Sequence, residues 1–408
     1  MRKVEDLKQI FAQTKKAFDL PEGMIYLDGN SLGPMTHASR ARLIDELDNQ
    51  WSKKLIKGWN ESGWYLLPQA VGDKIAKLIG ASKGTVTTAD NTSINVHKVL
   101  SAALSLNPER RVILSDSGNF PTDLYVAQGI IAKLNETADV PYELKVVTPE
   151  TVLDAIDEEV AVVMVTQVDY CTGRLHDMEK IVEKAKQLDV KTILDLCHSG
   201  GALDVQVEKL EVDFAVGCGY KYFNGGPGAP AFVYVKSSLI NDIQPVLTGW
   251  MGHDSPFAFD AKYTPMQGIG RMRVGTPSVL GLTCLDAALD VWEGITLAQV
   301  RERSLALSQL FIDEVKRRCP DLQLATPLNP DERGSQVSFH FDEAYALVQA
   351  LIARGVVGDF RMPNVARFGI TPLYLDEQDI IQAAEHLEDV IKTRSWDCPE
   401  FKTKNAVT

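Results

Sequence analysis

The chain has 408 residues, and its 42 Lys and Arg against 55 Asp and Glu give a formal charge of −13 at neutral pH. A hydrophobic share of 45% and a charged share of 24% are ordinary for a folded protein, and at about 150 residues per domain the length allows two to three domains without disulfides or structural metals. The acidic balance disfavours nucleic acid and anionic membrane surfaces, which both attract clustered Lys and Arg, so we expect a small-molecule partner.

The first 20 residues predict an amphipathic helix, because Leu7, Ile10 and Phe11 recur near helical spacing. They lack the continuous apolar stretch of a signal peptide. The longest uncharged apolar run, at 160–165, is far shorter than the roughly 20 residues that cross a bilayer. We therefore expect a cytoplasmic protein without a membrane span.

Short apolar runs alternate with helical stretches between about residues 51 and 263, a pattern typical of βαβ units and a largely parallel sheet. The runs are continuous rather than alternating, as in strands that are buried on both faces. We expect helices at 94–104 and 177–188, and strands at 111–114, 144–147, 160–166, 191–194, 214–218 and 231–235.

The pattern changes after about Pro277, where longer helical segments begin. We expect a helix at 300–319, a strand at 335–341, and helices at 344–354 and 376–394. These elements predict a large α/β domain, residues 50–282, and a smaller α+β domain, residues 1–49 and 283–408.

Signatures of several other enzyme classes are missing from the sequence. There is no P-loop, no GxSxG nucleophile elbow and no HExxH zinc motif, and Gly268-Ile-Gly270 followed by Gly275 does not fit the dinucleotide spacing. The six cysteines form no CxxC pair and have no histidine at a zinc-binding spacing. We therefore expect reduced core thiols and no metal site.

Two charged residues follow predicted strands. Asp195 ends one buried strand, and Lys221 follows the next apolar run in a Gly-rich turn. Both would point into the crevice at the carboxyl ends of the sheet, where open α/β folds bind ligands. Pyridoxal 5'-phosphate (PLP) requires such a pair, a lysine for a Schiff base and an aspartate beside its ring nitrogen. A helix-capping Asp and a solvated Lys explain the same spacing equally well.

Two further segments suit the same cofactor. Thr92 and Ser93 begin a predicted helix, where free N–H groups, hydroxyls and the helix dipole favour a phosphate. Plain N-capping is the commoner reason for such residues. Phe120 lies in a turn after the strand at 111–114, where its ring could stack on a flat cofactor. A Phe at the start of a loop belongs to the core more often than it stacks on a cofactor.

Seven separated blocks are no longer generic when they are taken together: YLDGNSLGP at 26–34, TSIN at 92–95, FPTD at 120–123, DLCHS at 195–199, GYKYFNGGPG at 219–228, GW at 249–250 and RFGITPLY at 367–374. This set closely resembles the kynureninase family, PLP enzymes of the aspartate-aminotransferase fold in the branch shared with cysteine desulfurases. The resemblance runs from about residue 24 to about residue 390. Phe368-Gly-Ile and Gly200-Gly201 depart slightly from the family's pattern, which leaves the pocket shape open.

The resemblance implies hydrolytic Cβ–Cγ cleavage of L-kynurenine, or its 3-hydroxy form, to anthranilate, or 3-hydroxyanthranilate, and L-alanine in tryptophan catabolism. It also implies a homodimer with the active site at the subunit interface. Lys221 resembles the Schiff-base lysine, Asp195 the partner of the ring nitrogen, Tyr220 a proton relay and His198 a neighbour of the cofactor.

The remaining roles follow from the same resemblance. Thr92, Ser93 and Tyr220 resemble phosphate ligands, as does Trp250, which is expected from the second subunit. Arg367 resembles the clamp for the substrate's α-carboxylate, a task that suits a planar guanidinium. The other residues implied to contact the cofactor or line the aryl pocket are Phe120 (the stacking ring), Pro121, Thr122, Asp123, Thr166, Trp64 and Thr276.

Two other classes share parts of this pattern. A cysteine desulfurase or selenocysteine lyase has the same fold and lysine but needs a nucleophilic Cys on a mobile loop, whereas Cys319 lies in a helical stretch and Cys398 lies near the tail. A PLP sensor fused to a DNA-binding module needs a basic helix-turn-helix extension, which the sequence lacks.

Overall fold

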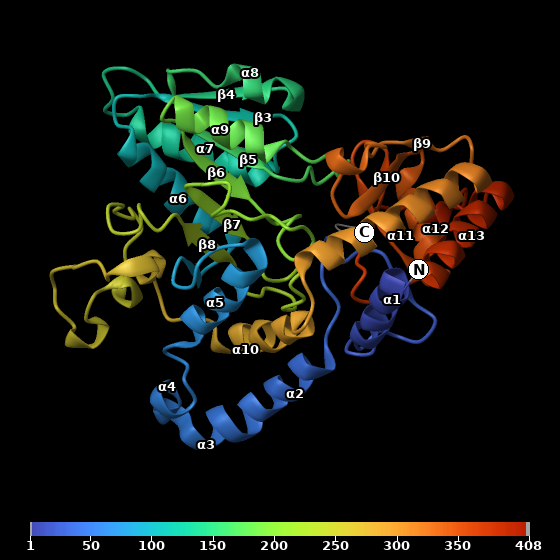
Figure 1. Ribbon diagram of the computed structural model, residues 1–408, viewed down its shortest axis with the longest axis horizontal. Coiled ribbons are helices and arrows are strands. Elements are labelled where there is room, and N and C mark those ends of the chain that lie inside the picture. Colours follow the sequence, from blue (N-terminus) through green and yellow to red (C-terminus); the bar gives the residue numbers. More distant parts are fainter. Residues whose placement is uncertain (1, 405–408) are drawn as a thin grey trace.

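A seven-stranded sheet forms the centre of the larger part of the computed structural model, which describes residues 2–404, with side chains from residue 7 (Figure 1). β8 runs antiparallel to both of its neighbours, and the other neighbouring strands are parallel. All six expected strands and the largely parallel sheet are confirmed, whereas β2 is too short to give a sequence pattern. In spatial order the strands are β2 (Val86–Thr88), β8 (Phe232–Val235), β7 (Phe214–Gly217), β6 (Lys191–Asp195), β5 (Val160–Thr166), β3 (Val112–Asp116) and β4 (Glu143–Val147).

Helices cover both faces of this sheet, which explains why its strands are apolar at every position. In β5, Val162 and Met164 pack in one cluster with α6 and α7, while Val163 and Val165 pack in another with α5 and α9. The helices of this part are α5 (Leu67–Ile79), α6 (Thr92–Leu106), α7 (Pro121–Leu134), α8 (Val152–Ala155), α9 (Met178–Gln187) and α10 (Val279–Ala288).

A second, antiparallel sheet lies in the C-terminal part, in the order β12-β13-β10-β9. The expected strand and the three expected helices of this part are confirmed, with ends that differ by at most three residues. The strands are β9 (Gln323–Leu324), β10 (Gln336–His340), β12 (Asp359–Arg361) and β13 (Val365–Gly369), and the helices are α11 (Leu297–Arg318), α12 (Ala344–Ile352), α13 (Glu377–Thr393) and α14 (Pro399–Lys402).

The N-terminal segment joins the C-terminal part before it leads into a projecting arm (Figure 1). Helix α1 (Arg2–Lys15) confirms the expected amphipathic helix, and β1 (Ile25–Tyr26) pairs in parallel with β11 (Val356–Val357). The arm consists of α2 (His37–Asp45), η1 (Glu46–Trp51), α3 (Ser52–Lys54), η2 (Leu55–Lys57) and α4 (Gly58–Glu61). The remaining short helices are η3 (Pro149–Thr151), η4 (Trp250–Gly252), η5 (Pro256–Ala258), η6 (Gly268–Met272), η7 (Leu289–Trp292) and η8 (Pro330–Glu332).

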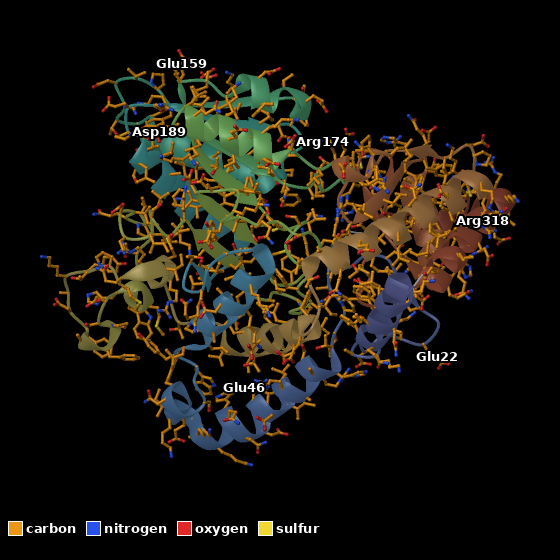
Figure 2. The ribbon with its side chains drawn as sticks, in the orientation of Figure 1. Glu22, Glu46, Glu159, Arg174, Asp189 and Arg318 are labelled. Atoms are coloured by element: carbon orange, nitrogen blue, oxygen red, sulfur yellow. The ribbon has the colours of Figure 1, made fainter. Side chains whose placement is uncertain are left out.

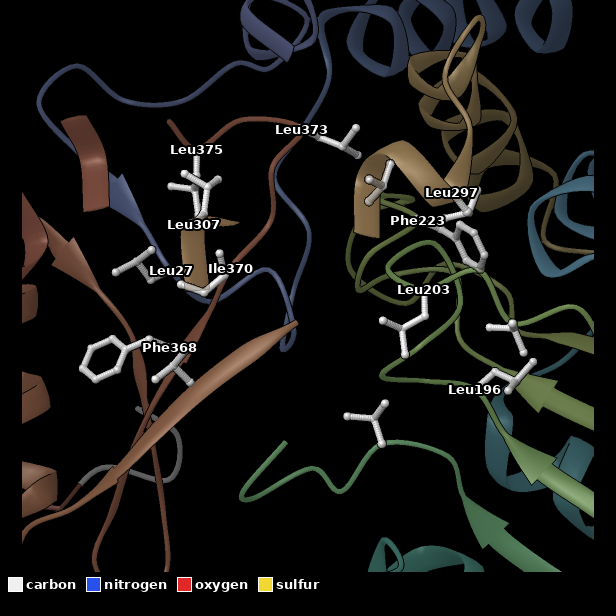
Figure 3. Packing of buried hydrophobic residues seen from close by; sticks show 14 of the residues in the cluster. Leu27, Leu196, Leu203, Phe223, Leu297, Leu307, Phe368, Ile370, Leu373 and Leu375 are labelled. Carbon is white, nitrogen blue, oxygen red and sulfur yellow. The ribbon is translucent and has the colours of Figure 1, made fainter. Parts of the chain in front are cut away.

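The larger hydrophobic core continues from one sheet to the other. Figure 3 shows Phe368 and Ile370 on the side of the small sheet, and Leu203 and Phe223 on the side of the large one. Leu297, at the start of α11, packs in the same cluster. The exact division into residues 50–282 and the two flanking segments stays a prediction. Within residues 2–404, no helix is long and apolar enough to cross a membrane.

Candidate active site

A cavity of about 140 Å³ lies where β5 and β6 end and where α6 and α7 begin. Asp195 is paired with Thr166 on one side and with Val216 on the other, so the ends of three parallel strands meet at the same edge of the sheet. The residues that line the cavity are Asn91, Thr92, Ser93, Phe120, Thr122, Asp123, Thr166, Asp195, Cys197, His198, Tyr220 and Lys221. Ten of these twelve are residues that the sequence singled out.

Lys221 lies beside His198 in this cavity. Its Nζ is 2.9 Å from His198 Nε2, and it lies 5.9 Å from the centre of the Phe120 ring. His198 is buried, and burial together with the charge of Lys221 lowers the pKa of the imidazole well below its usual value. The imidazole is therefore neutral and offers Lys221 a hydrogen-bond acceptor.

Two buried carboxyl groups face the same cavity. Burial raises the pKa of Asp195, an effect that the N–H of Cys197, 2.6 Å from Oδ1, partly offsets. The pKa of Asp123 is raised well above its usual range, first by burial and then by the charge of Asp195. Asp123 Oδ2 is buried and has no hydrogen-bond partner among the described residues. Lys221 lowers both pKa values, yet it is one cation beside two carboxyl groups.

The beginning of α6 offers an anion site in the wall of the same cavity. The side chain of Asn91 accepts a hydrogen bond from Ile94 N at 3.0 Å and so caps the helix. The N–H groups of Thr92 and Ser93 have no acceptor within the helix, and the dipole adds positive potential there. Thr92 Oγ1 lies 3.6 Å from Cys197 Sγ. Capping by Asn91 leaves the two hydroxyl residues available for a ligand.

Phe120 and Thr166 also line the cavity. Phe120 precedes the first turn of α7 and is 41% exposed, so its ring belongs to the cavity wall and not to the core. The edge of its ring packs against Tyr170, 5.2 Å away. Thr166 donates a hydrogen bond to Asn119 Oδ1. Pro121 lies at the first turn of α7, behind this wall.

Besides Pro121 and Arg367, three of the predicted residues lie outside the cavity lining. Trp64 is buried in the arm, where Nε1 donates to Glu46 Oε1 at 2.7 Å (Figure 2 labels Glu46). Trp250 begins η4 and is 37% exposed. Thr276 is exposed and lines a separate cavity of about 170 Å³ just before α10. Their predicted roles stay predictions.

Arg367 also lies outside the cavity lining, on β13 of the small sheet. It is fully buried, and Nε donates to Asp359 Oδ1 at 2.7 Å while Nη2 donates to Ser31 Oγ at 2.7 Å. Nη1 donates to the carbonyl of Tyr170. The edge of the guanidinium that would grip a carboxylate with two bonds therefore already faces Asp359.

Sequence reasoning missed several residues of the site. Asn91 stands in the run Asp-Asn-Thr-Ser, in which each residue type can cap a helix, so the sequence does not show which one does. Cys197 is a neighbour of two predicted residues but carries no motif of its own. Gln336 contacts His198 from the small sheet at 3.2 Å, and only the tertiary fold brings these two together.

The residues of the cavity fit PLP. A protonated ring nitrogen would supply a second cation beside Asp195 and Asp123, and it would give Asp123 Oδ2 the partner that it lacks among the described residues. A phosphate suits the free N–H groups at Thr92 and Ser93, and an exposed aromatic ring suits the face of a flat cofactor. The lysine that would hold the aldehyde carbon lines the same cavity.

Two family models match parts of the chain. A model described as "Kynureninase C-terminal domain" matches residues 300–387, and one described as "DegT/DnrJ/EryC1/StrS aminotransferase family" matches residues 44–208. The solved structures that match have the same fold at low identity. A cysteine desulfurase from Thermococcus onnurineus NA1 has 18% identity and a TM-score of 0.77, covering 94% of this chain and 98% of its own. The cysteine desulfurase CsdA from Escherichia coli has 19% identity and a TM-score of 0.75, with the same coverage.

Curated relatives are much more similar in sequence. A kynureninase from Pseudomonas fluorescens is 43% identical over 410 residues, which cover 99% of this chain and 98% of the relative. A kynureninase from Burkholderia pseudomallei is 44% identical over 404 residues, 97% of this chain and 96% of the relative. The chain belongs to the kynureninase family.

Proposed function

We propose that this protein is a PLP-dependent hydrolase that cleaves the Cβ–Cγ bond of L-kynurenine, or of its 3-hydroxy form, to give anthranilate, or 3-hydroxyanthranilate, and L-alanine. The observation that carries this proposal is the convergence of Lys221, Asp195 and the start of α6 on one cavity, in a chain 44% identical to a kynureninase. The reaction is a step of tryptophan catabolism, and the expected location is the cytoplasm.

The cavity divides the binding of PLP among three groups of residues. Thr92 and Ser93 would hold the phosphate, Asp195 and Asp123 the ring nitrogen, and Phe120 one face of the ring. When bound, PLP supplies a cationic ring that accepts the electron pair released at the substrate's Cα. Asp195 maintains that charge, because a buried carboxylate stabilises a protonated nitrogen beside it.

Lys221 is the proposed base at the substrate's Cα. Its amine is held next to the neutral imidazole of His198, which accepts a hydrogen from it without competing for the proton. The lysine then returns the proton to the substrate, so one group carries out both transfers.

Tyr220 is the proposed proton donor to the oxygen of the carbonyl group whose carbon the attacking water adds to. Burial and the neighbouring Cys218 raise the pKa of its phenol, so it keeps its proton and serves as a donor. Hydration of the carbonyl next to the ring develops a negative oxygen there, and breakage of the Cβ–Cγ bond needs a proton on the leaving alanyl fragment. Tyr220, half-buried at the cavity wall, is placed for such a relay.

The substrate's α-carboxylate is assigned to Arg367 and its neighbour Arg361. Asp359 is the acidic partner of both arginines, and the neighbouring Asp28 is partly neutral because its pKa is raised to about 7, so a substrate carboxylate would complete the charge balance. Burial opposes ionisation of Asp359, but the charge of Arg367 and its hydrogen bonds hold the pKa of that carboxyl below its ordinary value. Arg361 is 32% exposed and is the more accessible of the two cations.

A homodimer with shared active sites is the proposed assembly. The arm carries exposed apolar side chains, and the segment around Trp250 carries others; both project from the body of the molecule (Figure 1). The exposed apolar residues of the arm and of the segment around Trp250, with their flanks, include Leu47, Trp51, Leu55, Ile56, Leu66, Trp250, Phe257 and Phe259.

Thr276 lies just before α10, whose first turn has no side-chain cap and is therefore open to an anion.

Cysteine desulfurases share the fold, so the fold alone does not select the reaction. Two of the thiols in this chain are poor nucleophiles. Burial, and then the charge of Asp169, raises the pKa of Cys171 to about 11, and burial and Glu388 raise that of Cys319 to about 11. Substrate tests separate the two reactions. With kynurenine we expect anthranilate fluorescence, and with cysteine we expect no sulfide. Sulfide from cysteine without anthranilate from kynurenine would contradict this proposal.

A further inference from the structure

Gln336 connects the small sheet to the cavity through the imidazole of His198. It stands at the start of β10, is fully buried, and its Oε1 lies 3.2 Å from His198 Nδ1. The other ring nitrogen, Nε2, lies 2.9 Å from Lys221 Nζ. A chain of two hydrogen bonds therefore joins a residue of the C-terminal sheet to the lysine of the proposed function.

The surroundings of Gln336 decide which way its amide points. Nε2 donates to the carbonyl of Tyr170 at 3.1 Å and to that of Asp169 at 3.4 Å, and Asn30 Nδ2 donates to Oε1 at 3.4 Å. If the amide were turned over, Oε1 would face two carbonyl oxygens, and Nε2 would face another amide nitrogen. Both contacts would be repulsive, so Oε1 must be the atom that faces His198.

The tautomer of His198 follows from this orientation. Oε1 is only an acceptor, so Nδ1 must carry the ring hydrogen and donate it. Nε2 then has a free lone pair directed at Lys221. The cations that face the ring are Lys221 and, from the small sheet, Arg367 and Arg361, all of which disfavour an imidazolium. The carboxyl groups of Asp195 and Asp123 line the same cavity.

We propose that Gln336 is a positioning residue, which fixes His198 in the Nδ1–H tautomer and thereby presents the Nε2 lone pair to Lys221. This inference rests on the proposed function of Lys221. The lysine donates one hydrogen to Nε2 as an amine, which orients its own lone pair, and it keeps the same acceptor once it has taken the substrate's proton.

The carbonyl of Tyr170 extends this network toward the substrate's carboxylate. It accepts from Gln336 Nε2 and also from Arg367 Nη1. A ligand that moves Arg367 would therefore change the contacts of the residue that orients His198. The lysine and the proposed carboxylate site share one backbone oxygen as a common neighbour.

The direct test is nitrogen NMR of the holoenzyme labelled with 15N-histidine, with His198→Gln used only to assign the signal. We expect a neutral ring with the hydrogen on Nδ1 between about pH 6 and 9, where an ordinary histidine titrates or becomes neutral with mixed tautomers. A ring with the hydrogen on Nε2, or one that titrates in the ordinary way, would overturn the proposal. This measurement needs no variant of Gln336.

Substitution tests the consequence for Lys221. In Gln336→Glu the carboxylate would stabilise an imidazolium, so His198 should now titrate between about pH 6 and 9. The acidic limb of the kcat–pH profile should therefore move to higher pH by about one unit. Gln336→Met should lower kcat about tenfold or more with a smaller change in KM. Gln323→Glu puts the same charge at an exposed position on the neighbouring strand β9. This control should change neither kcat nor its pH dependence.

An unchanged pH profile in Gln336→Glu, with the cofactor still bound, would overturn the proposal while leaving the proposed function intact. Failure of the wild-type chain to cleave kynurenine would instead remove the proposed function, and the NMR result would still report the tautomer.

Discussion

Arg367 and Asp359 face each other across the neighbouring strands β13 and β12, and two hydrogen bonds join the guanidinium to the carboxylate. Both side chains are almost fully buried. The pair shows that the proposed carboxylate clamp is already held in place before a substrate arrives, and it decides how the clamp is to be tested. Arg367→Ala would leave Asp359 as a buried charge without its main partner, which destabilises a fold by about 3–5 kcal/mol.

Arg367→Lys is the more informative substitution. The lysine keeps a positive charge beside Asp359 but lacks the planar guanidinium, which can bind Asp359 and other acceptors at the same time. We expect KM for kynurenine to rise by about tenfold or more while kcat changes less. Arg303→Lys, which removes a buried guanidinium that also makes two hydrogen bonds to one carboxylate, that of Glu377, is the matched control. Steady-state kinetics would contradict the clamp if KM stayed at the wild-type value in Arg367→Lys.

Asp195→Asn should separate cofactor binding from catalysis. The amide keeps the shape of the side chain but no longer stabilises a positive charge on the ring nitrogen. We expect the variant to retain PLP and to lose at least about a thousandfold in kcat. Wild-type turnover in a variant that contains the cofactor would remove Asp195 from the role of ring-nitrogen partner.

Lys221→Ala should lose the absorbance band of the lysine–cofactor linkage and nearly all turnover. The physical reason is that the other residues of the cavity wall carry no amine. Lys77→Ala, an exposed lysine on α5, is the control and should behave as wild type. Borohydride reduction followed by peptide mapping gives the check, because an adduct that persists in Lys221→Ala would place the linkage elsewhere.

Asp28 predicts a measurable pH dependence of stability. Burial, and then the charge of Asp359, raises its pKa to about 7 from 3.8, and its Oδ1 is buried without a partner among the described residues. Because the folded state binds the proton more tightly than the unfolded state, this group stabilises the fold at low pH and loses its contribution as pH rises from about 4 to 7.

Asp28→Asn removes this titration. Relative to that variant, the free energy of unfolding of the wild type should fall across this window by up to about 4 kcal/mol. Urea denaturation at a series of pH values gives both curves. Parallel curves for the two proteins would show that Asp28 titrates normally.

The shared active site can be tested by mixing subunits. If Lys221 acts with Trp250 of the second subunit, Lys221→Ala and Trp250→Ala dimers each have two damaged sites, whereas a mixed dimer has one intact site. Random exchange should therefore restore about a quarter of the wild-type activity. Sites complete within one chain would give no recovery after unfolding and refolding the mixture.

The parts of the structure that the sequence predicts are those with a strong local signal. The strand at 160–166 is found at the same residues because the uncharged apolar run at 160–165 is rich in β-branched valine and suits a strand covered on both faces. Lys221 and Asp195 follow strands that end at one sheet edge, so topology alone brings them together. Thr92 and Ser93 carry the chemistry of a helix start in the sequence itself.

The remaining parts depend on contacts between distant segments. Gln336 meets His198 across 138 positions of the chain, and no pattern around either residue indicates the other. The arm has short turns of mixed helix type, and its buried Trp64 is held by Glu46 and not by the cavity. Asp359 was not singled out because its importance comes from its strand partner, Arg367.

The most direct test of the central claim is the product balance with L-kynurenine in the PLP-loaded protein. We predict that anthranilate and L-alanine form in equal amounts, and that Lys221→Ala forms neither. Alanine from cysteine, with sulfide released by an added thiol reductant and without anthranilate from kynurenine, would contradict the account and assign the site to desulfurase chemistry.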